Sequence, residues 1–487
     1  MEQQTIERLK EMPREELIAL VMMLQAENAG LRTAIEQLRS EIEALRKQIK
    51  GPLANSENSS QPPSRDRKGD GRLERKHGER GAKAGHERKV RPLVDKPDQI
   101  IEAKVASCAG CGQDLRGVTP DQVIRRQVTE LPEIKPAVIE TQQAHVTCPG
   151  CGAHNCGELP EGLAAGRQFG PRLEAVLVYF MHQQHMSYAR AQAALEELFG
   201  IEISEGGEAR VMERAGELAQ VKADQIAEVV KCSPVIGSDE TSGRVDKDNW
   251  WEWTFVSTQG VVHVFEYTRE AKAISNFMGE HRAEVWVSDL HKSQLTAPTQ
   301  THQICLAHQI RDVKRLIEEQ PDLSWAIELQ NVFKAAIHLR HKRDNLRKQL
   351  KPDDPREPMN EPWFKRQRTA LENQLDTLLK RPVPPGRAET LRERYRTHRD
   401  HLFVFLYDAR VPPTNNACER ALRPSVIHRK ISNGFRSSWG PRAYAALSTV
   451  IDTAKLKGQA VFETLVNLMG LPVLQFLQPA VAINSSA

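Results

Sequence analysis

Two short segments with one shared pattern decide the fold: Val235-Ile-Gly-Ser-Asp239 and Val285-Trp-Val-Ser-Asp289. Each has an apolar run of strand length, then a serine, then an aspartate. We expect each to be a β-strand that ends at its carboxylate. In a sheet that places the two strands side by side, both carboxylates meet at one edge.

The segments around these two strands alternate between strand and helix patterns. Residues 250–257 and 261–267 predict two strands joined by a short turn, and 271–279 predicts a helix. A short strand at 303–306 leads into another helix. The order of one strand, a hairpin, a helix, a strand, a short strand and a helix is typical of a mixed α/β sheet of the ribonuclease-H type.

A long, charged, helical stretch interrupts this order. Residues 316–347 and 362–380 predict long helices, and Arg381-Pro-Val-Pro-Pro-Gly386 predicts a bend or loop. We interpret residues from about 312 to 412 as a helical insertion within a catalytic domain that covers 233–447.

A third acid follows the insertion in Thr414-Asn-Asn-Ala-Cys-Glu419-Arg-Ala-Leu-Arg423. Asn415 or Asn416 can cap a helix, which places Glu419 in its first turn. Three carboxylates, Asp239, Asp289 and Glu419, can hold two Mg²⁺ (or Mn²⁺) ions about 4 Å apart for an in-line displacement at phosphorus. Any single acid among 64 can be a solvated surface residue, but the matched strand ends argue against that reading.

The N-terminal segment, residues 1–50, carries a heptad repeat. The d positions hold Leu17, Leu24, Leu31, Leu38 and Leu45, and the a positions hold Val21, Asn28, Ile35, Ile42 and Ile49. Leucine at d with β-branched residues at a favours a parallel two-stranded coiled coil, and an asparagine at a fixes its register. We predict a dimerisation zipper; the alternative is an amphipathic helix packed on its own chain.

The next segment, residues 51–98, is predicted to be a flexible basic linker. It begins with a polar, proline-containing stretch, and 64–92 then holds eleven Lys or Arg against five acids. Such a segment can neutralise DNA phosphates, although a solvated tail is the alternative. The predicted DNA contacts in the linker are Arg65, Arg67, Lys68, Arg75, Lys76, Lys83, Arg88 and Lys89.

Residues 99–160 contain two Cys-x-x-Cys pairs, Cys108-Ala-Gly-Cys111 and Cys148-Pro-Gly-Cys151. The strand-like stretches 122–129 and 137–146 lie between them. Two such pairs joined by strands describe a zinc ribbon with four thiolate ligands, which leaves no open position and predicts a structural Zn²⁺.

Residues 161–232 predict a helical domain. Two helices, 173–185 and 187–199, are followed by a glycine-containing turn and by Ser204 as the next N-cap. The pattern fits a DNA-binding helix-turn-helix, and a plain helical linker domain fits it equally well.

The N-terminus lacks the apolar core of a signal peptide, and no apolar run reaches the length of about 20 residues that a bilayer needs. The expected location is therefore the cytoplasm, with no membrane partner.

The order of these features resembles the transposases of the insertion sequence 66 family over nearly the whole chain. The resemblance rests on Gly81-Ala-Lys-Ala-Gly-His86, Asp239-Glu-Thr241, Cys305-Leu-Ala-His308-Gln-Ile-Arg311 and Asn415-Asn-Ala-Cys-Glu-Arg-Ala-Leu-Arg423. Ser448–Met469 resembles the family's C-terminal helical segment, and we predict such a segment over 448–487. One departure is that Leu290-His291-Lys292 follows Asp289, where the family usually has glycine and an aromatic residue.

The resemblance implies a DNA transposase whose active site is a DDE triad made of Asp239, Asp289 and Glu419. It also implies binding to the terminal repeats of a mobile element and to target DNA, association with the nucleoid, and accessory proteins of the same element as partners. The competing functions are a non-catalytic, zinc-containing DNA-binding protein and a nuclease that hydrolyses without joining. The zipper and the basic linker favour the pairing of two DNA ends.

Two further groups of residues complete the expected site. Cys305 and His308 lack two partners for a metal site of their own, so we expect them to contact the active site or a flipped base. On the helix of Glu419, the basic residues predicted to contact phosphates are Arg420, Arg423 and Lys430, with a solvated helix face as the alternative.

Overall fold

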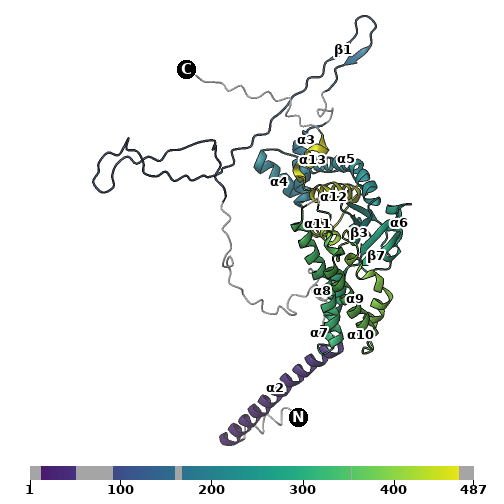
Figure 1. Ribbon diagram of the computed structural model, residues 1–487. Helices are drawn as coiled ribbons and strands as arrows, with labels where there is room; N and C mark the ends of the chain where they lie inside the picture. Colours follow the sequence, from purple (N-terminus) through teal and green to yellow (C-terminus); the bar gives the residue numbers. More distant parts are fainter. Residues whose placement is uncertain (1–11, 51–90, 160–166, 352–353, 471–487) are drawn as a thin grey trace. The chain divides into compact units, whose positions relative to one another are not determined.

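The computed structural model describes residues 12–50, 91–159, 167–351 and 354–470 (Figure 1). The predicted DNA contacts of the linker, Arg65 to Lys89, lie outside the described residues. Contacts divide the chain into two units. The described part of the smaller unit is 91–138 and 194–201, and the larger unit holds the remainder, including the sheet.

A five-stranded mixed sheet forms the centre of the larger unit, which confirms the predicted mixed α/β sheet. Its strands, in spatial order, are β5 (Val261–Glu266), β4 (Asp248–Val256), β3 (Val235–Val245), β6 (Ala283–Ser288) and β7 (Thr299–Ile304). The pairs β3–β4 and β4–β5 are antiparallel, and β3–β6 and β6–β7 are parallel. The two aspartate-bearing strands are therefore neighbours.

One strand is longer than the sequence predicts. β3 does not end at Asp239 but continues to Val245, because it pairs with β4 from Gly237 through Val245. Asp239 thus lies within a strand, whereas Asp289 follows the last residue of β6.

The two faces of the sheet pack against different helices. Val235, Val285 and Val287 belong to a core shared with α7 (Leu306–Glu319) and the helices that follow it. Ile236 and Trp286 point to the opposite face, where the side chains of α6 (Lys272–Met278) cover them. This alternation, normal for a strand, puts Asp239 and Asp289 on the α7 face.

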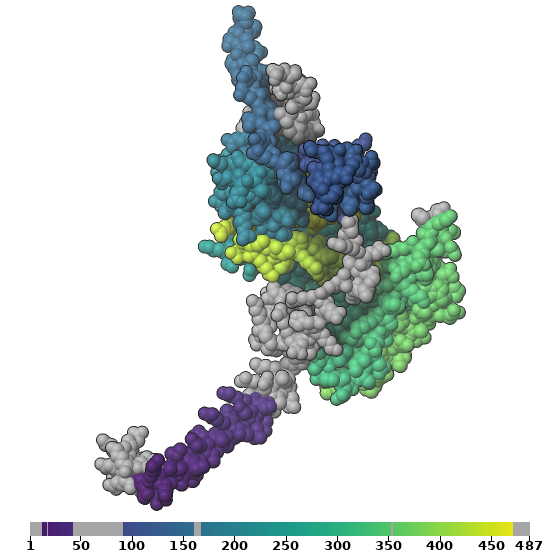
Figure 2. All heavy atoms as spheres, turned by 90° about the vertical axis from the view of Figure 1, so that its left-hand side faces the viewer, coloured from purple at the N-terminus to yellow at the C-terminus, as the bar shows by residue number. Residues whose placement is uncertain are grey.

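The insertion consists of α8 (Ser324–Gln349), α9 (Pro362–Lys380) and α10 (Arg387–Thr397), packed on α7. Figure 2 shows this region, in green, as one continuous mass of atoms. The prediction for α9 is confirmed. The single helix predicted over 316–347 is wrong, because α7 ends at Glu319 and α8 begins at Ser324. Pro321 stands between them, and proline interrupts a helix.

Helices that precede and follow the sheet along the chain complete the larger unit. They are α3 (Pro171–Val178), a π-helical turn (Tyr179–Gln183), α5 (Glu205–Lys231), α11 (Asn416–Ser432), α12 (Gly440–Leu456) and α13 (Val461–Met469). α12 packs on α5 and β5 and spans the predicted domain boundary at 447/448. Ser204 caps α5 as predicted, accepting a hydrogen bond from the Gly207 N–H. α4 (Tyr188–Phe199) matches its predicted range within one residue.

The described residues of the N-terminal and cysteine-containing segments are mostly exposed to solvent. α2 (Arg14–Lys50) is a single helix. In the predicted zinc domain the strands are β1 (His145–Thr147) and β2 (His154–Cys156). The strand predicted over 122–129 is wrong, since those residues form none. Among the described residues, no helix combines the length and the apolar character that a bilayer crossing requires.

Candidate active site

The register of β3 and β6 places the two aspartates at matching positions. Val235 pairs with Val285 and Gly237 with Val287. Asp239 and Asp289 come two residues later along these parallel segments. Both lie on the same face as the paired residues, because side chains alternate with a period of two. The shared Ser-Asp ending of the two segments therefore corresponds to a real juxtaposition.

Asp239 is an acid surrounded by other acids. Burial raises the pKa of Asp239 well above its usual range, and Glu240, Asp289 and Glu419 raise it further. One stabilising contact is the backbone N–H of Glu240, 3.0 Å from Asp239 Oδ1. Among the described residues no basic side chain forms an ion pair with it. Such a carboxylate suits a bound cation.

The neighbouring Glu240 is an acid of a different kind. Its carboxylate lies on the opposite face of β3, where it accepts hydrogen bonds from Arg269 Nε at 2.8 Å and Gln294 Nε2 at 2.6 Å. Both oxygens thus have partners. The contrast separates Glu240, which has basic and amide partners, from Asp239, whose charge the neighbouring acids oppose.

The start of α11 is attached directly to β3. Asn415 Nδ2 donates to the Ser238 carbonyl over 2.7 Å. A Cβ at Gly237 would lie 3.0 Å from both Asn415 Oδ1 and Cys418 Sγ, so this close approach leaves little room for a side chain. Asn415 is the N-cap residue, but its side chain makes no capping bond. The N-cap position is thus as predicted, but the amide bonds to the strand and not to the helix.

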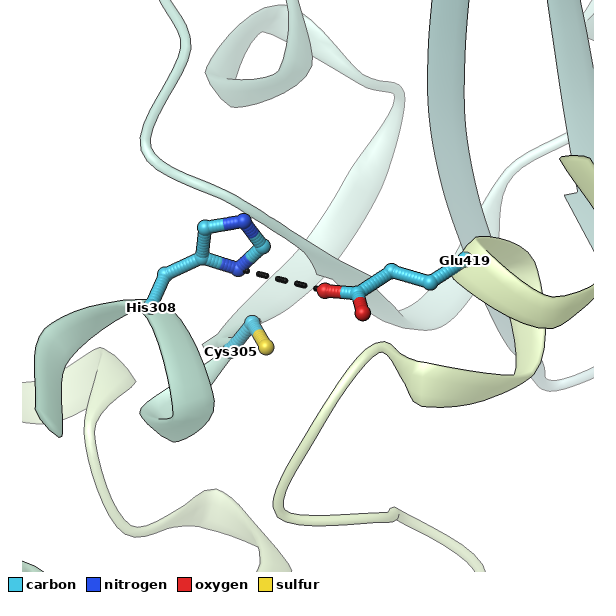
Figure 3. Close-up of side chains that lie close together, drawn as sticks. All are labelled: Cys305, His308 and Glu419. Atoms are coloured by element: carbon cyan, nitrogen blue, oxygen red, sulfur yellow. Dashed lines mark ion pairs between the residues drawn. The ribbon is translucent and has the colours of Figure 1, made fainter. Parts of the chain in front are cut away.

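Glu419 lies in the first turn of α11 and faces two residues of α7. Its Oε1 is 3.2 Å from Arg311 Nη2 and 3.7 Å from His308 Nδ1 (Figure 3). Burial lowers the pKa of His308, and Arg311 lowers it further. Sequence reasoning did not give Arg311 a role, although its position one helical turn after His308 puts both on one face.

Cys305 joins three segments at this point. Its N–H donates to the Ser288 carbonyl at the end of β6 over 2.8 Å, and its Sγ accepts from the Asn415 N–H at 3.1 Å. Burial raises the pKa of the Cys305 thiol to about 11, while backbone N–H groups of Asn415, His308 and Ala307 act in the opposite direction. The structure thus brings Cys305, His308 and Glu419 together.

These carboxylates match the chemistry of a divalent metal. Mg²⁺ and Mn²⁺ prefer oxygen ligands, and Asp239, Asp289 and Glu419 supply them from two adjacent strands and one helix. The mutual repulsion that raises the pKa of Asp239 is the interaction a cation would relieve. The carboxylates are therefore of the type that the predicted metal prefers, although among the described residues their oxygen atoms do not all lie within 4.8 Å of one another.

Comparison with known proteins gives a match to the family described as Transposase IS66 family, over residues 166–443. The chain belongs to this family. The matched region contains Asp239, Asp289 and Glu419 and excludes α2 and both Cys-x-x-Cys pairs. An uncharacterized protein of Sinorhizobium fredii, y4qI, is 25% identical over 399 residues, which is 75% of this chain and 70% of the relative.

Outside the family match, the two cysteine pairs of this IS66-family chain have the same local geometry. The N–H of Gly112 donates to the Cys108 carbonyl at 2.9 Å, and that of Gly152 donates to the Cys148 carbonyl at 2.8 Å. Both glycines have positive φ, 76° and 72°. Backbone N–H groups lower the pKa of Cys108 and of Cys148. Each turn is thus suited to present two thiolates.

The basic residues predicted on the helix of Glu419 are accessible. Arg420, Arg423 and Lys430 are exposed on α11. They do not contact the three acids, and no described side chain forms an ion pair with them. Their side chains are free to meet an external anion.

Proposed function

We propose that this member of the IS66 family is a DNA transposase that binds the ends of a mobile element and catalyses metal-dependent strand cleavage and strand transfer. The observation that carries the proposal is the convergence of Asp239 and Asp289, at matching positions of adjacent parallel strands, with Glu419 on a helix attached to the same strand. The mixed sheet with three acids on one face supports a ribonuclease-H-like catalytic domain.

In this proposal Asp239, Asp289 and Glu419 hold the Mg²⁺ or Mn²⁺ ions. Ions held there would supply activation of a water or a 3′-hydroxyl and stabilisation of the leaving oxygen in an in-line displacement. Asn415 and Gly237 fix the distance between α11 and β3, and Arg311 orients the Glu419 carboxylate. Phosphoryl transfer depends mainly on positioning and charge, so no covalent nucleophile is needed.

DNA binding is proposed for two sets of basic residues. Arg420, Arg423 and Lys430 stand exposed on the helix of Glu419, where they would contact phosphates beside the metals. The linker contributes Arg65, Arg67, Lys68, Arg75, Lys76, Lys83, Arg88 and Lys89, which would neutralise phosphates further along the element ends and the target.

Zinc and dimerisation would organise the N-terminal half. The two cysteine turns are proposed to share one structural Zn²⁺ through Cys108, Cys111, Cys148 and Cys151. On α2, Val21, Leu24, Leu31, Ile35 and Leu38 are all exposed by 46% or more, so the described residues of one chain leave this apolar seam uncovered. A second copy would bury it as a coiled coil.

The test uses purified protein, labelled DNA with the element's terminal repeats, and Mg²⁺ or Mn²⁺. Wild type is compared with Asp289→Asn, and an exposed aspartate far from the site, Asp248→Asn, is the matched control. We expect wild type and Asp248→Asn to nick and join the ends, and Asp289→Asn to bind them without cleavage. Cleavage by Asp289→Asn at the wild-type rate would contradict the proposed site. Binding without cleavage by all three would favour the non-catalytic DNA-binding function.

A further inference from the structure

Three side chains, one of them Glu419 of the acidic cluster, form a second group of metal-ligand type. Cys305 Sγ, one ring nitrogen of His308 and one carboxylate oxygen of Glu419 all lie within 4.8 Å of one another (Figure 3). Among the described residues this is the one cluster of three or more such groups. We infer that Cys305, His308 and Glu419 bind a transition-metal ion of the zinc class, distinct from the Mg²⁺ or Mn²⁺ of the proposed reaction.

The His308 imidazole supplies the first argument. Its Nδ1 is buried and has no hydrogen-bond partner among the described residues. Glu419 Oε1 is 3.7 Å away, too far for a hydrogen bond. Two nitrogen or oxygen ligands about 2.1 Å from a tetrahedral zinc lie roughly 3.4 Å apart. The separation of the two atoms is therefore close to that of ligands on either side of a metal ion.

The surroundings of Cys305 supply the second argument. The cysteine is fully buried, and its sulfur accepts the Asn415 N–H at 3.1 Å. It stands at the N-cap position of α7, where the helix dipole favours negative charge. Backbone donors and a helix N-terminus offset part of the rise that burial causes in the pKa of this thiol, and a bound cation would favour the thiolate, which is the form that binds metal.

The donor set selects the metal class. Mg²⁺ prefers oxygen ligands alone, whereas thiolate and imidazole ligands favour zinc and similar ions. Three protein ligands leave a fourth tetrahedral position for an oxygen ligand. Arg311 occupies only part of the Glu419 carboxylate, since a carboxylate has about four acceptor positions. The proposed site therefore shares Glu419 with the acidic cluster while drawing its selectivity from Cys305 and His308.

The test measures zinc bound per chain in the full-length protein, after saturation with Zn²⁺ and removal of the excess. Cys305→Ser and His308→Ala should each bind one equivalent less than wild type. Cys418→Ser is the matched control, because Cys418 is also buried beside Glu419 but lies outside the cluster. Zinc held by the four N-terminal cysteines is common to all variants and cancels in the comparison.

Co²⁺ provides a second readout, because a thiolate–cobalt charge-transfer absorption must weaken in Cys305→Ser and persist in Cys418→Ser. If Cys305→Ser does not fold, His308→Ala still decides the outcome. Equal zinc content in wild type and His308→Ala overturns the inference, as does an equal loss in Cys418→Ser. The measurement contains no DNA, so it is independent of strand transfer: Asp289→Asn should retain the zinc equivalent even though it loses the proposed reaction.

Discussion

His263 on β5 gives a prediction whose magnitude follows from the structure. Its buried ring lies between two carboxylates, with Nδ1 2.9 Å from Glu252 Oε1 and Nε2 3.2 Å from Asp452 Oδ2. Burial opposes the charged form, but the hydrogen bonds to Asp452 and Glu252 outweigh it and raise the pKa of His263 from 6.5 to about 9. Glu252 also accepts from Ser425 of α11 at 2.8 Å, so the network supports the helix of Glu419.

The raised pKa means that the folded protein holds this proton more tightly than the unfolded chain. The stabilisation is complete below pH 6.5 and is lost as the pH rises from 6.5 towards 9. The shift corresponds to about 3 kcal/mol of unfolding free energy, at roughly 1.4 kcal/mol per pKa unit.

Urea unfolding between pH 6.5 and 9, followed by the intrinsic fluorescence of the seven tryptophans, measures the effect. Wild type should lose most of that free energy across the range. His263→Gln should be less stable at pH 6.5, because Glu252 and Asp452 lose their shared cation, and should lack this part of the pH dependence. His281→Gln, at an exposed histidine, is the control. Parallel pH profiles for wild type and His263→Gln would refute the reasoning.

Three further predictions concern the site and the zipper. Gly237→Ala should destabilise the protein by about 1–3 kcal/mol, because the added methyl group overpacks against α11. It should also slow DNA cleavage on the order of 100-fold, because Glu419 is then misplaced. The control Gly206→Ala, where an added Cβ meets no atom within 4 Å, should have neither effect. Arg311→Ala should lower the cleavage rate by roughly 10-fold or more, because the Glu419 carboxylate loses the side chain that orients it. It should also change the Mn²⁺ concentration needed for cleavage, and an unchanged Mn²⁺ dependence would count against that role. Leu31→Lys should convert the dimer to monomers in sedimentation velocity, and a dimer that persists would exclude the zipper.

The central sheet was predictable because local patterns encode it. The repeated Ser-Asp endings of 235–239 and 285–289 lie in neighbouring parallel strands, as expected. The length of β3 was not predictable in the same way, because residues 240–245 are polar or small and form a strand only through their pairing with β4. The break between α7 and α8, in contrast, had a local signal in Pro321 that sequence reasoning overlooked.

The parts of the site that sequence reasoning missed depend on contacts between distant segments. Asparagine is a residue type that commonly caps helices, but the amide of Asn415 donates to the Ser238 carbonyl because Gly237 lets α11 approach β3. The third partner of Cys305 and His308 is Glu419, more than 100 positions away, so spacing within the Cys-x-x-His element could not reveal it. Residues 122–129 have strand-like content, but no neighbouring strand pairs with them.

The most direct test of the central claim is metal rescue at the second aspartate. Asp289→Cys replaces a hard oxygen ligand by a soft sulfur, which binds Mg²⁺ poorly and Mn²⁺ better. If Asp289 holds the catalytic metal, cleavage of labelled element ends by Asp289→Cys should be lost in Mg²⁺ and recovered in Mn²⁺, while Asp289→Ala stays inactive in both. Wild-type cleavage by Asp289→Ala in Mg²⁺, or no difference between the metals for Asp289→Cys when wild type cleaves in both, would contradict metal binding by Asp289.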